Sequence, residues 1–181
     1  MFNDAERILI SEADLHKIVS KLGAEITDDY KDKNLLLVSV LKGAVVFMTD
    51  LMREIKIPCS IDFMATSSYE GAKSTGVVKI IKDLDEDITG KDVLIVEDIL
   101  DSGRTLSYIT SILLKRNPAS LKICTLLDKP AARVVETVQP DYTGATVEDE
   151  FVIGYGLDYN EKYRNLPYIA ILKREIYQNS K

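Results

Sequence analysis

Residues 96–105 hold the side chains of this chain that are best suited to chemistry. They read Val-Glu-Asp-Ile-Leu-Asp-Ser-Gly-Arg-Thr. The apolar run before them, 92–96, predicts a buried strand, and the apolar spacing of 105–115 predicts a helix. Free backbone N–H groups at a helix start suit a phosphate, and the carboxylates of Glu97 and Asp98 suit sugar hydroxyls or a hydrated magnesium ion. We therefore expect this strand–turn–helix element to hold a phosphorylated sugar by both ends.

A plainer interpretation of this segment stays open. Asp101, Ser102 and Gly103 are ordinary turn formers, and Glu97 and Asp98 are equally compatible with a solvated strand end. However, crowded carboxylates repel one another unless a cation or hydroxyl donors lie among them. We therefore favour a binding site over a simple turn.

Composition limits the classes of function. The chain has 181 residues, 46% of them hydrophobic, which suits one domain with a sizeable core. A net charge of −6 argues against nucleic acid or an anionic membrane as the main partner. His16 is the single histidine, which argues against histidine triads, and Cys59 and Cys124 in apolar runs suggest reduced, buried thiols. With no signal peptide and no apolar run of about 20 residues, we expect a cytoplasmic protein.

The wider pattern predicts an α/β protein. Apolar strand-like runs alternate with helical spacing, which favours a three-layer fold with a mostly parallel sheet flanked by helices. We expect one domain over 1–181, with a core at about 35–150 and a small hood from about 1–15 and 151–181 over the carboxyl ends of the strands. The predicted strands are 35–40, 59–66, 77–82, 92–96, 121–127, 142–146, 151–155 and 168–172, and the predicted helices begin at Ser11 as a cap and cover 44–55 and 105–115.

The stretch 93–105 resembles the 5-phosphoribosyl-1-pyrophosphate binding motif of type I phosphoribosyltransferases. The resemblance implies that Glu97 and Asp98 bind the ribose hydroxyls, directly or through Mg²⁺. It also implies that Asp101 reaches the purine N7 as general base or hydrogen-bond acceptor. The residues that it assigns to the 5′-phosphate are Asp101, Ser102, Gly103, Arg104 and Thr105.

Two loops have both an ordinary and a functional interpretation. The glycine of Lys42-Gly43 is typical of a tight turn between a strand and a helix. The polar segment 67–76 suits either a hairpin linker or a lid that excludes water from a reactive site. In the family that the motif resembles, both loops contact pyrophosphate. The resemblance therefore assigns Lys42, Gly43, Ser68 and Tyr69 to pyrophosphate, and implies a cis peptide between Leu41 and Lys42.

The run 151–164 is the last candidate segment. Its Gly154-Tyr155-Gly156 lacks the third glycine and the following helix of a dinucleotide loop, so that alternative fails. The run resembles the base-binding region of hypoxanthine-guanine phosphoribosyltransferases, although core packing is the simpler interpretation of Phe151 alone. The resemblance assigns the purine base to Lys129, Phe151, Val152 and Asp158, the metal to Glu97, Asp98 and Asp158, and the pyrophosphate to Arg164 as well. Phe151 would stack on the purine, the Val152 backbone would recognise the base edge, and Lys129 would donate to the oxygen at position 6.

The resemblance thus implies purine salvage. The expected reaction joins hypoxanthine or guanine to 5-phosphoribosyl-1-pyrophosphate, with Mg²⁺ as cofactor, and gives inosine or guanosine monophosphate. A related transferase that uses xanthine or a pyrimidine, and a non-catalytic regulator on the same fold, are the alternatives. The expected partners are small molecules, with neither nucleic acid nor membrane, and a homodimer or homotetramer is implied.

Overall fold

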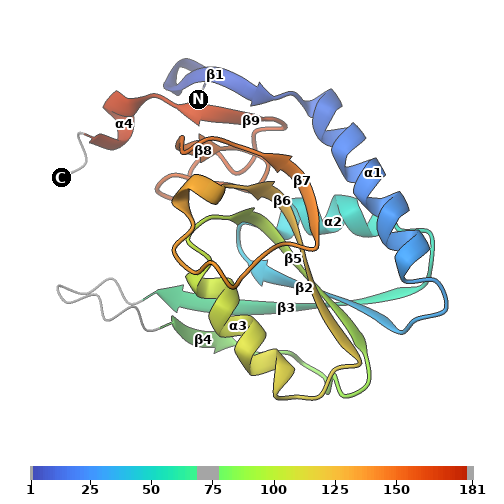
Figure 1. Cartoon of the computed structure of the whole chain (residues 1–181). Coiled ribbons are helices and arrows are strands. Elements are labelled where there is room, and N and C mark those ends of the chain that lie inside the picture. The colour runs from blue at the N-terminus through green and yellow to red at the C-terminus, as the bar shows by residue number, and fades with distance from the viewer. Residues whose placement is uncertain (1, 69–77, 179–181) are drawn as a thin grey trace.

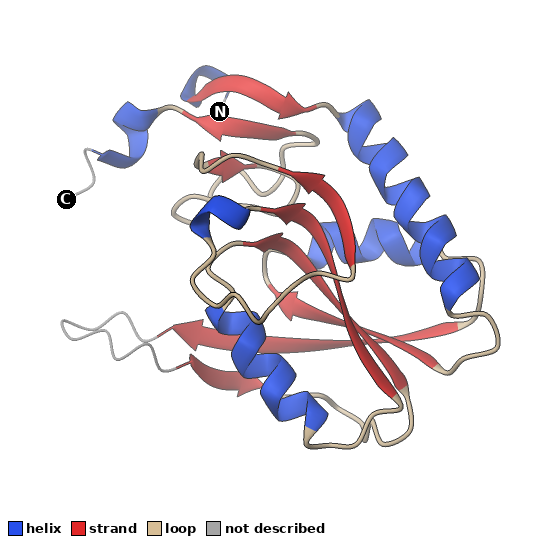
Figure 2. Ribbon diagram, in the orientation of Figure 1, coloured by secondary structure: helices blue, strands red, loops and turns tan. Residues whose placement is uncertain are grey.

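The computed structural model describes residues 2–68 and 78–178. Its strands are β1 (Ala5–Ile10), β2 (Leu35–Leu41), β3 (Cys59–Ser68), β4 (Val78–Lys82), β5 (Asp92–Leu100), β6 (Ser120–Asp128), β7 (Tyr142–Thr146), β8 (Val152–Ile153) and β9 (Ile169–Leu172). Its helices are α1 (Glu12–Asp29), α2 (Val45–Glu54), α3 (Arg104–Leu114) and α4 (Arg174–Gln178), with short 3-10 turns at Phe2–Asp4 and Pro130–Ala132. Figures 1 and 2 show a large sheet with helices on both faces and a smaller sheet above one edge of it. This arrangement confirms the predicted α/β class.

The large sheet has six strands in the order β4-β3-β2-β5-β6-β7. Four of its five pairings are parallel, and only β3–β4 is antiparallel. The central strand β2 is apolar along almost its whole length because both of its faces are covered. Side chains of α1 and α2 pack on one face of the sheet, and side chains of α3 pack on the other. The carboxyl ends of β2, β5, β6 and β7 therefore meet at one edge.

The hood is a three-stranded antiparallel sheet in the order β1-β9-β8. It lies over the carboxyl ends of the large sheet, where Figure 1 shows it above β6 and β7. The N-terminal strand β1 was not predicted. Three of its six side chains, Glu6, Arg7 and Ile8, are exposed, so the strand has no clear apolar alternation. Among the described residues, no helix is both long enough and apolar enough to cross a membrane.

Several predicted element bounds need correction. The strand β5 continues to Leu100 and pairs with β6 on both sides of Asp98, so Glu97 and Asp98 lie within the strand and not after its end at residue 96. The strand β3 runs through Ser68, and Tyr69 lies outside the described residues. The hood strand that contains Val152 is short and begins after Phe151. The short helix α4 was not predicted, and the remaining helices and strands agree with prediction to within a few residues.

Smaller expectations also have outcomes. Ser11 is the N-cap of α1, because its hydroxyl accepts a hydrogen bond from the backbone N–H of Asp14 at 3.2 Å. His16 is exposed on the same helix. Both cysteines are free thiols; Cys124 is buried as predicted, but Cys59 is only half-buried. Burial raises the pKa of both thiols, which favours their uncharged forms.

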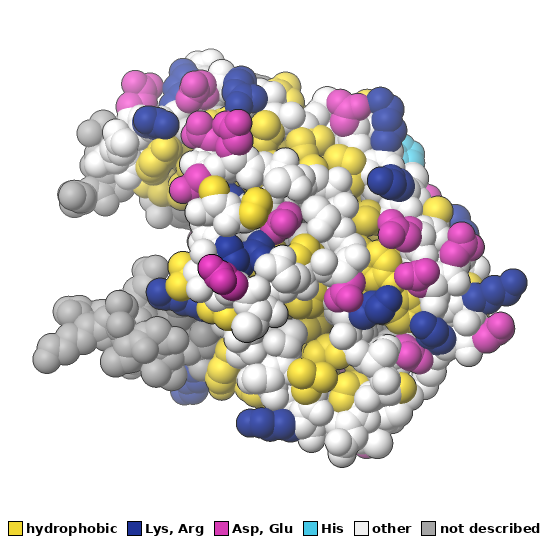
Figure 3. All heavy atoms as spheres, in the orientation of Figure 1, with side chains coloured by type: hydrophobic (Ala, Val, Ile, Leu, Met, Phe, Trp, Pro, Cys, Tyr) yellow, Lys and Arg dark blue, Asp and Glu magenta, His cyan; other side chains and the backbone are white. Residues whose placement is uncertain are grey.

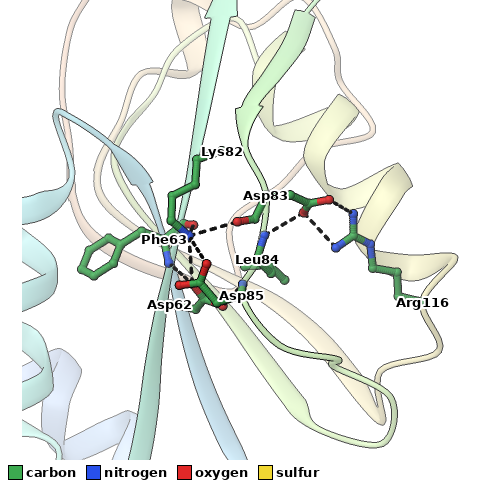
Figure 4. Close-up of polar contacts among 7 residues, drawn as sticks. All are labelled: Asp62, Phe63, Lys82, Asp83, Leu84, Asp85 and Arg116. Carbon is green, nitrogen blue, oxygen red and sulfur yellow. Dashed lines mark hydrogen bonds and ion pairs between the residues drawn. The ribbon is translucent and has the colours of Figure 1, made fainter.

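Polar contacts fasten the antiparallel edge strand β4 (Figure 4). The buried Asp62 carboxylate accepts a hydrogen bond from the backbone N–H of Asp85 at 2.8 Å and lies 3.5 Å from Lys82 Nζ. Beyond β4, Arg116 donates two hydrogen bonds to the Asp83 carboxylate, at 2.9 and 2.7 Å. These contacts tie the loop after β4 to β3 on one side and to the segment after α3 on the other.

Candidate functional site

The candidate site lies where the carboxyl ends of β2, β5 and β6 face the hood. Figure 3 shows that the molecule is hollowed below the hood on this side. The phosphate-loop element is built as the sequence predicts. Gly103 has a left-handed φ of +79° and is the N-cap of α3, with no capping side chain. The first-turn N–H groups of α3 therefore lack the usual side-chain acceptor and suit an anion. Around them Ser102 and Thr105 are half-buried, whereas Asp101 and Arg104 are exposed.

Arg133 anchors the loop 100–103 before α3 through hydrogen bonds to its backbone, a role that the sequence analysis did not predict. Its Nε donates to the carbonyl of Asp101 at 2.8 Å, and its Nη2 donates to the carbonyl of Leu100 at 3.3 Å and to the Asp128 carboxylate. Its side chain is 6% exposed. The carbonyl of Ser102 accepts further hydrogen bonds from the segment just after Arg133. A lone arginine in a loop has no periodic signal, and its role depends on contacts some thirty residues away.

Replacing Arg133 by Met is expected to lower the free energy of unfolding by about 3 kcal/mol, because the largely buried Asp128 carboxylate would lose its partner. The matched control is Arg116→Met at the more exposed Asp83 pair, which is expected to cost at most about 1 kcal/mol. Urea denaturation of both variants measures the difference. Equal losses would contradict the role given to Arg133.

The acidic pair at the end of β5 is poorly solvated and only partly paired. Asp98 is 7% exposed, and burial raises its pKa to about 6, although a hydrogen bond from the Ile99 N–H to its Oδ1, at 2.8 Å, works in the opposite direction. Burial and the neighbouring Asp98 raise the pKa of Glu97 well above its usual range. The buried Glu97 Oε2 has no hydrogen-bond partner. Such a pair favours a cation or hydroxyl donors beside it.

Two glycines allow close backbone packing beside Asp98: Gly43 lies next to its carboxylate, and Gly156 lies next to Gly43. A Cβ placed on Gly43 would lie 1.9 Å from Asp98 Oδ2, and a Cβ on Gly156 would lie 2.1 Å from the carbonyl oxygen of Gly43. Gly156 also has a φ of +100°, a conformation that side chains disfavour. The peptide bond between Leu41 and Lys42 is cis, as the resemblance implied. Three separate segments are thus stacked with no room for a methyl group between them.

The pair fits a magnesium ion that is only partly bound by protein. Mg²⁺ usually takes one or two carboxylates and completes its octahedron with water and substrate phosphates. Glu97 and Asp98 supply two carboxylates and one oxygen without a partner. Asp158, expected as a third ligand, lies 2.9 Å from Arg164 Nη2 and accepts from the Glu161 N–H. No cluster of three or more metal-binding side chains forms within residues 2–68 and 78–178.

Replacing Asp98 by Asn is expected to stabilise the protein without substrates at about pH 8, by roughly 3 kcal/mol, and to have little effect at about pH 4. The folded protein holds the Asp98 proton more tightly than the unfolded chain, whose pKa is near 3.8. Stability due to this group is therefore complete below about pH 4 and is lost as the pH rises through about 6. Thermal unfolding of both proteins across this range measures the effect, and a stability gap independent of pH would contradict it.

The cations assigned to pyrophosphate, Lys42 and Arg164, share one carboxylate partner, Glu161. Lys42 Nζ lies 3.1 Å from Glu161 Oε1, and Arg164 Nη2 lies 3.4 Å from Glu161 Oε2. Arg164 also donates to the carbonyl of Gly156 at 2.8 Å. The structure therefore brings Lys42, Gly43 and Arg164 together from distant parts of the chain. Glu161 between them was not foreseen.

The residues assigned to the base follow strand ends. Lys129 is 8% exposed, its N–H donates to the carbonyl of Leu100 at 3.0 Å, and its Nζ lies 3.3 Å from Asp149. Phe151 is half-buried in a cluster of aromatic rings. Its ring stacks on Tyr177 at 5.0 Å between centroids and meets Tyr159 edge-on at 5.5 Å. Val152 is buried, and the side chains of Ser68 and Tyr69 lie outside what the structure describes.

Comparisons with known proteins point in the same direction. A family model of the phosphoribosyl transferase domain matches residues 9–160. The hypoxanthine-guanine phosphoribosyltransferase of Staphylococcus aureus is 52% identical over 180 residues, which cover 99% of this chain and 100% of that protein. The bifunctional protein TilS/HprT of Listeria monocytogenes is 54% identical over 178 residues, and this chain spans only 27% of its length.

Solved structures agree with this fold. A crystal structure of a hypoxanthine phosphoribosyltransferase from Staphylococcus aureus matches with a TM-score of 0.95 at 52% identity, covering 99% of this chain and 97% of that chain. A hypoxanthine-guanine phosphoribosyltransferase from Bacillus anthracis matches with a TM-score of 0.88 at 45% identity, covering 94% of this chain and 98% of that chain. The carboxyl-edge site described above is thus built on the same fold as theirs.

Proposed function

This chain belongs to the phosphoribosyl transferase family, and we propose that it moves the 5-phosphoribosyl group from 5-phosphoribosyl-1-pyrophosphate to N9 of hypoxanthine or guanine. The products are inosine or guanosine monophosphate and pyrophosphate. The main support for the proposal is one observation: a carboxylate pair, Glu97 and Asp98, with one buried oxygen that lacks a partner, lies shortly before the uncapped start of α3. The two features match the hydroxyl and phosphate ends of a phosphorylated sugar.

The donor would be held at three places. The first-turn N–H groups of α3, with the hydroxyls of Ser102 and Thr105, would bind its 5′-phosphate. Glu97 and Asp98 would bind the ribose hydroxyls, directly or through Mg²⁺. Its pyrophosphate would lie against Lys42, the Gly43 N–H and Arg164, whose planar guanidinium suits a bidentate grip. Ser68 and Tyr69 would cover that pyrophosphate, and Asp158 would stay near its metal.

The purine would lie under the hood. Its ring would stack on Phe151, its edge would meet the Val152 backbone, and Lys129 would donate to the oxygen at position 6. Because an ammonium group donates hydrogen bonds but cannot accept them, this position disfavours the amino group of adenine.

The reaction breaks the bond between the anomeric carbon and pyrophosphate while purine N9 attacks that carbon. Asp101, at the mouth of the phosphate loop, would take or hold the proton at purine N7 as positive charge builds on the base. When bound, Mg²⁺ would supply charge neutralisation of the leaving group. Lys42 and Arg164 would orient the same oxygens.

The proposal is tested by incubating the purified chain with the donor, Mg²⁺ and one base at a time, and following nucleotide formation and pyrophosphate release. Turnover with hypoxanthine or guanine is expected. Turnover with xanthine alone would indicate the related transferase, and donor binding without pyrophosphate release would indicate a regulator. Sedimentation of the same sample tests the proposed homodimer or homotetramer.

Replacing Lys129 by Gln is expected to lower kcat/KM for hypoxanthine about 10- to 100-fold and to narrow the preference over adenine. The amide can still donate a hydrogen bond, but it lacks the charge that strengthens the bond to the purine oxygen. Steady-state kinetics with each base measures both effects. Unchanged base selectivity would remove Lys129 from the base site.

A further inference from the structure

We propose that the Glu161 carboxylate is an internal counter-anion of the pyrophosphate subsite, held between Lys42 and Arg164 until the donor or free pyrophosphate displaces it. This inference rests on the proposed function, which assigns those two cations to pyrophosphate. It adds a residue whose charge opposes ligand binding and thereby promotes product release.

The contacts place Glu161 where an anion would bind. One carboxylate oxygen, Oε1, lies 3.1 Å from Lys42 Nζ, and the other, Oε2, lies 3.4 Å from Arg164 Nη2. Lys42 comes from the loop after β2, 119 residues earlier in the chain. A carboxylate presents two oxygens to lysine and arginine much as a phosphate does. Glu161 therefore satisfies the same two donors that a pyrophosphate group would require.

The ion pairs are weak enough to be exchanged. The side chains of Lys42 and Glu161 are 67% and 65% exposed, so water and dissolved anions compete with their attraction. Arg164 keeps a stronger hold on Asp158, at 2.9 Å, and on the Gly156 carbonyl. Displacement of Glu161 would therefore leave the guanidinium in place.

The backbone gives a second, independent observation. Tyr159 and Lys162 exchange hydrogen bonds across a tight turn, and the two residues between them, Asn160 and Glu161, have φ values of +51° and +59°. This is the type I′ pattern, in which the second central position favours glycine. A long acidic side chain at that position is disfavoured by the backbone. Its presence therefore points to a use for the carboxylate.

The charge balance supports the same conclusion. Counted among the four paired side chains alone, the charges of Lys42 and Arg164 cancel those of Asp158 and Glu161. Asp98 lies close enough to interact with Arg164 and Asp158, and adds negative charge beside this cluster. With the Glu161 side chain swung into solvent, the cluster carries one negative charge fewer. The polyanionic ligand thus meets a more attractive site only after it has displaced the internal anion.

Glu161→Gln removes the charge and keeps the size of the side chain. Titration calorimetry with magnesium pyrophosphate is expected to show about three- to tenfold tighter binding than in wild type. Inhibition by pyrophosphate should strengthen to the same extent, while KM for hypoxanthine stays unchanged. The matched control is Glu86→Gln, which removes a carboxylate paired with Lys91 at 3.0 Å, away from the site, and should alter neither quantity.

A second variant separates charge from turn geometry. Glu161→Gly relieves the left-handed backbone and is expected to match Glu161→Gln in pyrophosphate affinity, with an equal or higher melting temperature. Unchanged or weaker pyrophosphate binding by both folded variants, with donor turnover intact, would overturn the inference. Wild-type protein that neither binds pyrophosphate nor turns over the donor would refute the proposed function, and the inference with it.

Discussion

Asp101→Asn is expected to lower kcat about 10²- to 10⁴-fold, the usual contribution of a positioned acid or base. The amide has nearly the same shape as the carboxylate but cannot take a proton from purine N7. The loop itself should not change, because the Asp101 side chain is exposed and its backbone carbonyl is held by Arg133 Nε at 2.8 Å. Binding of the nucleotide product should therefore weaken far less than turnover.

Single-turnover kinetics and calorimetry with inosine monophosphate measure the two quantities separately. The matched control is Asp28→Asn, which makes the same chemical change at an exposed residue near the end of α1, outside the site. It should change neither turnover nor nucleotide binding. Wild-type turnover in the Asp101 variant would show that the N7 proton leaves by another route. Equal losses of turnover and nucleotide binding would point to a binding role only.

Gly43→Ala is expected to lower kcat/KM by about 10²-fold or more, because small displacements of catalytic groups have effects of this size. The added Cβ would lie 1.9 Å from Asp98 Oδ2, a distance that forces the buried carboxylate or the loop to move. Either movement would disturb the ribose and metal site and the Gly43 N–H together. Kinetics with varied donor and varied Mg²⁺ should show the loss.

Gly90→Ala is the control for the backbone effect of alanine. Gly90 has a φ of +73°, but no atom outside Gly90 and its two chain neighbours lies within 4 Å of the position that its Cβ would take, so the substitution adds strain of about 1 kcal/mol and no clash. It should lower the melting temperature slightly and leave kcat/KM unchanged. Wild-type kinetics in the folded Gly43 variant would contradict the tight contact between the loop and Asp98.

The parts of this molecule that follow from local patterns were predictable. The parallel strands appear as short apolar runs because both faces of β2 and β5 are covered, and Gly103 marks the turn before α3. The end of β5 was misplaced because Glu97 and Asp98 look like a strand end, although backbone pairing with β6 continues to Leu100. Acidic side chains do not prevent pairing at the edge where ligands bind.

Contacts between distant loops were not predictable from one sequence. No sequence pattern surrounds Arg133, and its structural role depends on hydrogen bonds to the carbonyls of Leu100 and Asp101, which only the folded chain brings close to it. The resemblance assigned roles to Lys42 and Arg164 but none to Glu161, although Glu161 lies within the run 151–164 that carries it, because its contact with Lys42 spans 119 residues of the chain. Tyr177 likewise belongs to a C-terminal helix that motif comparison did not include, yet its ring lies on Phe151.

The buried guanidinium of Arg133 has a consequence for protein engineering. It joins the ends of β5 and β6, and so couples the proposed donor site to the strand end that directly precedes Lys129. The aromatic platform at Phe151 belongs instead to the hood. Redesign toward unnatural nucleobases should therefore change hood residues and leave Arg133 unchanged. Loss of its hydrogen bonds would shift the sugar and the acceptor base relative to each other in every variant of a library.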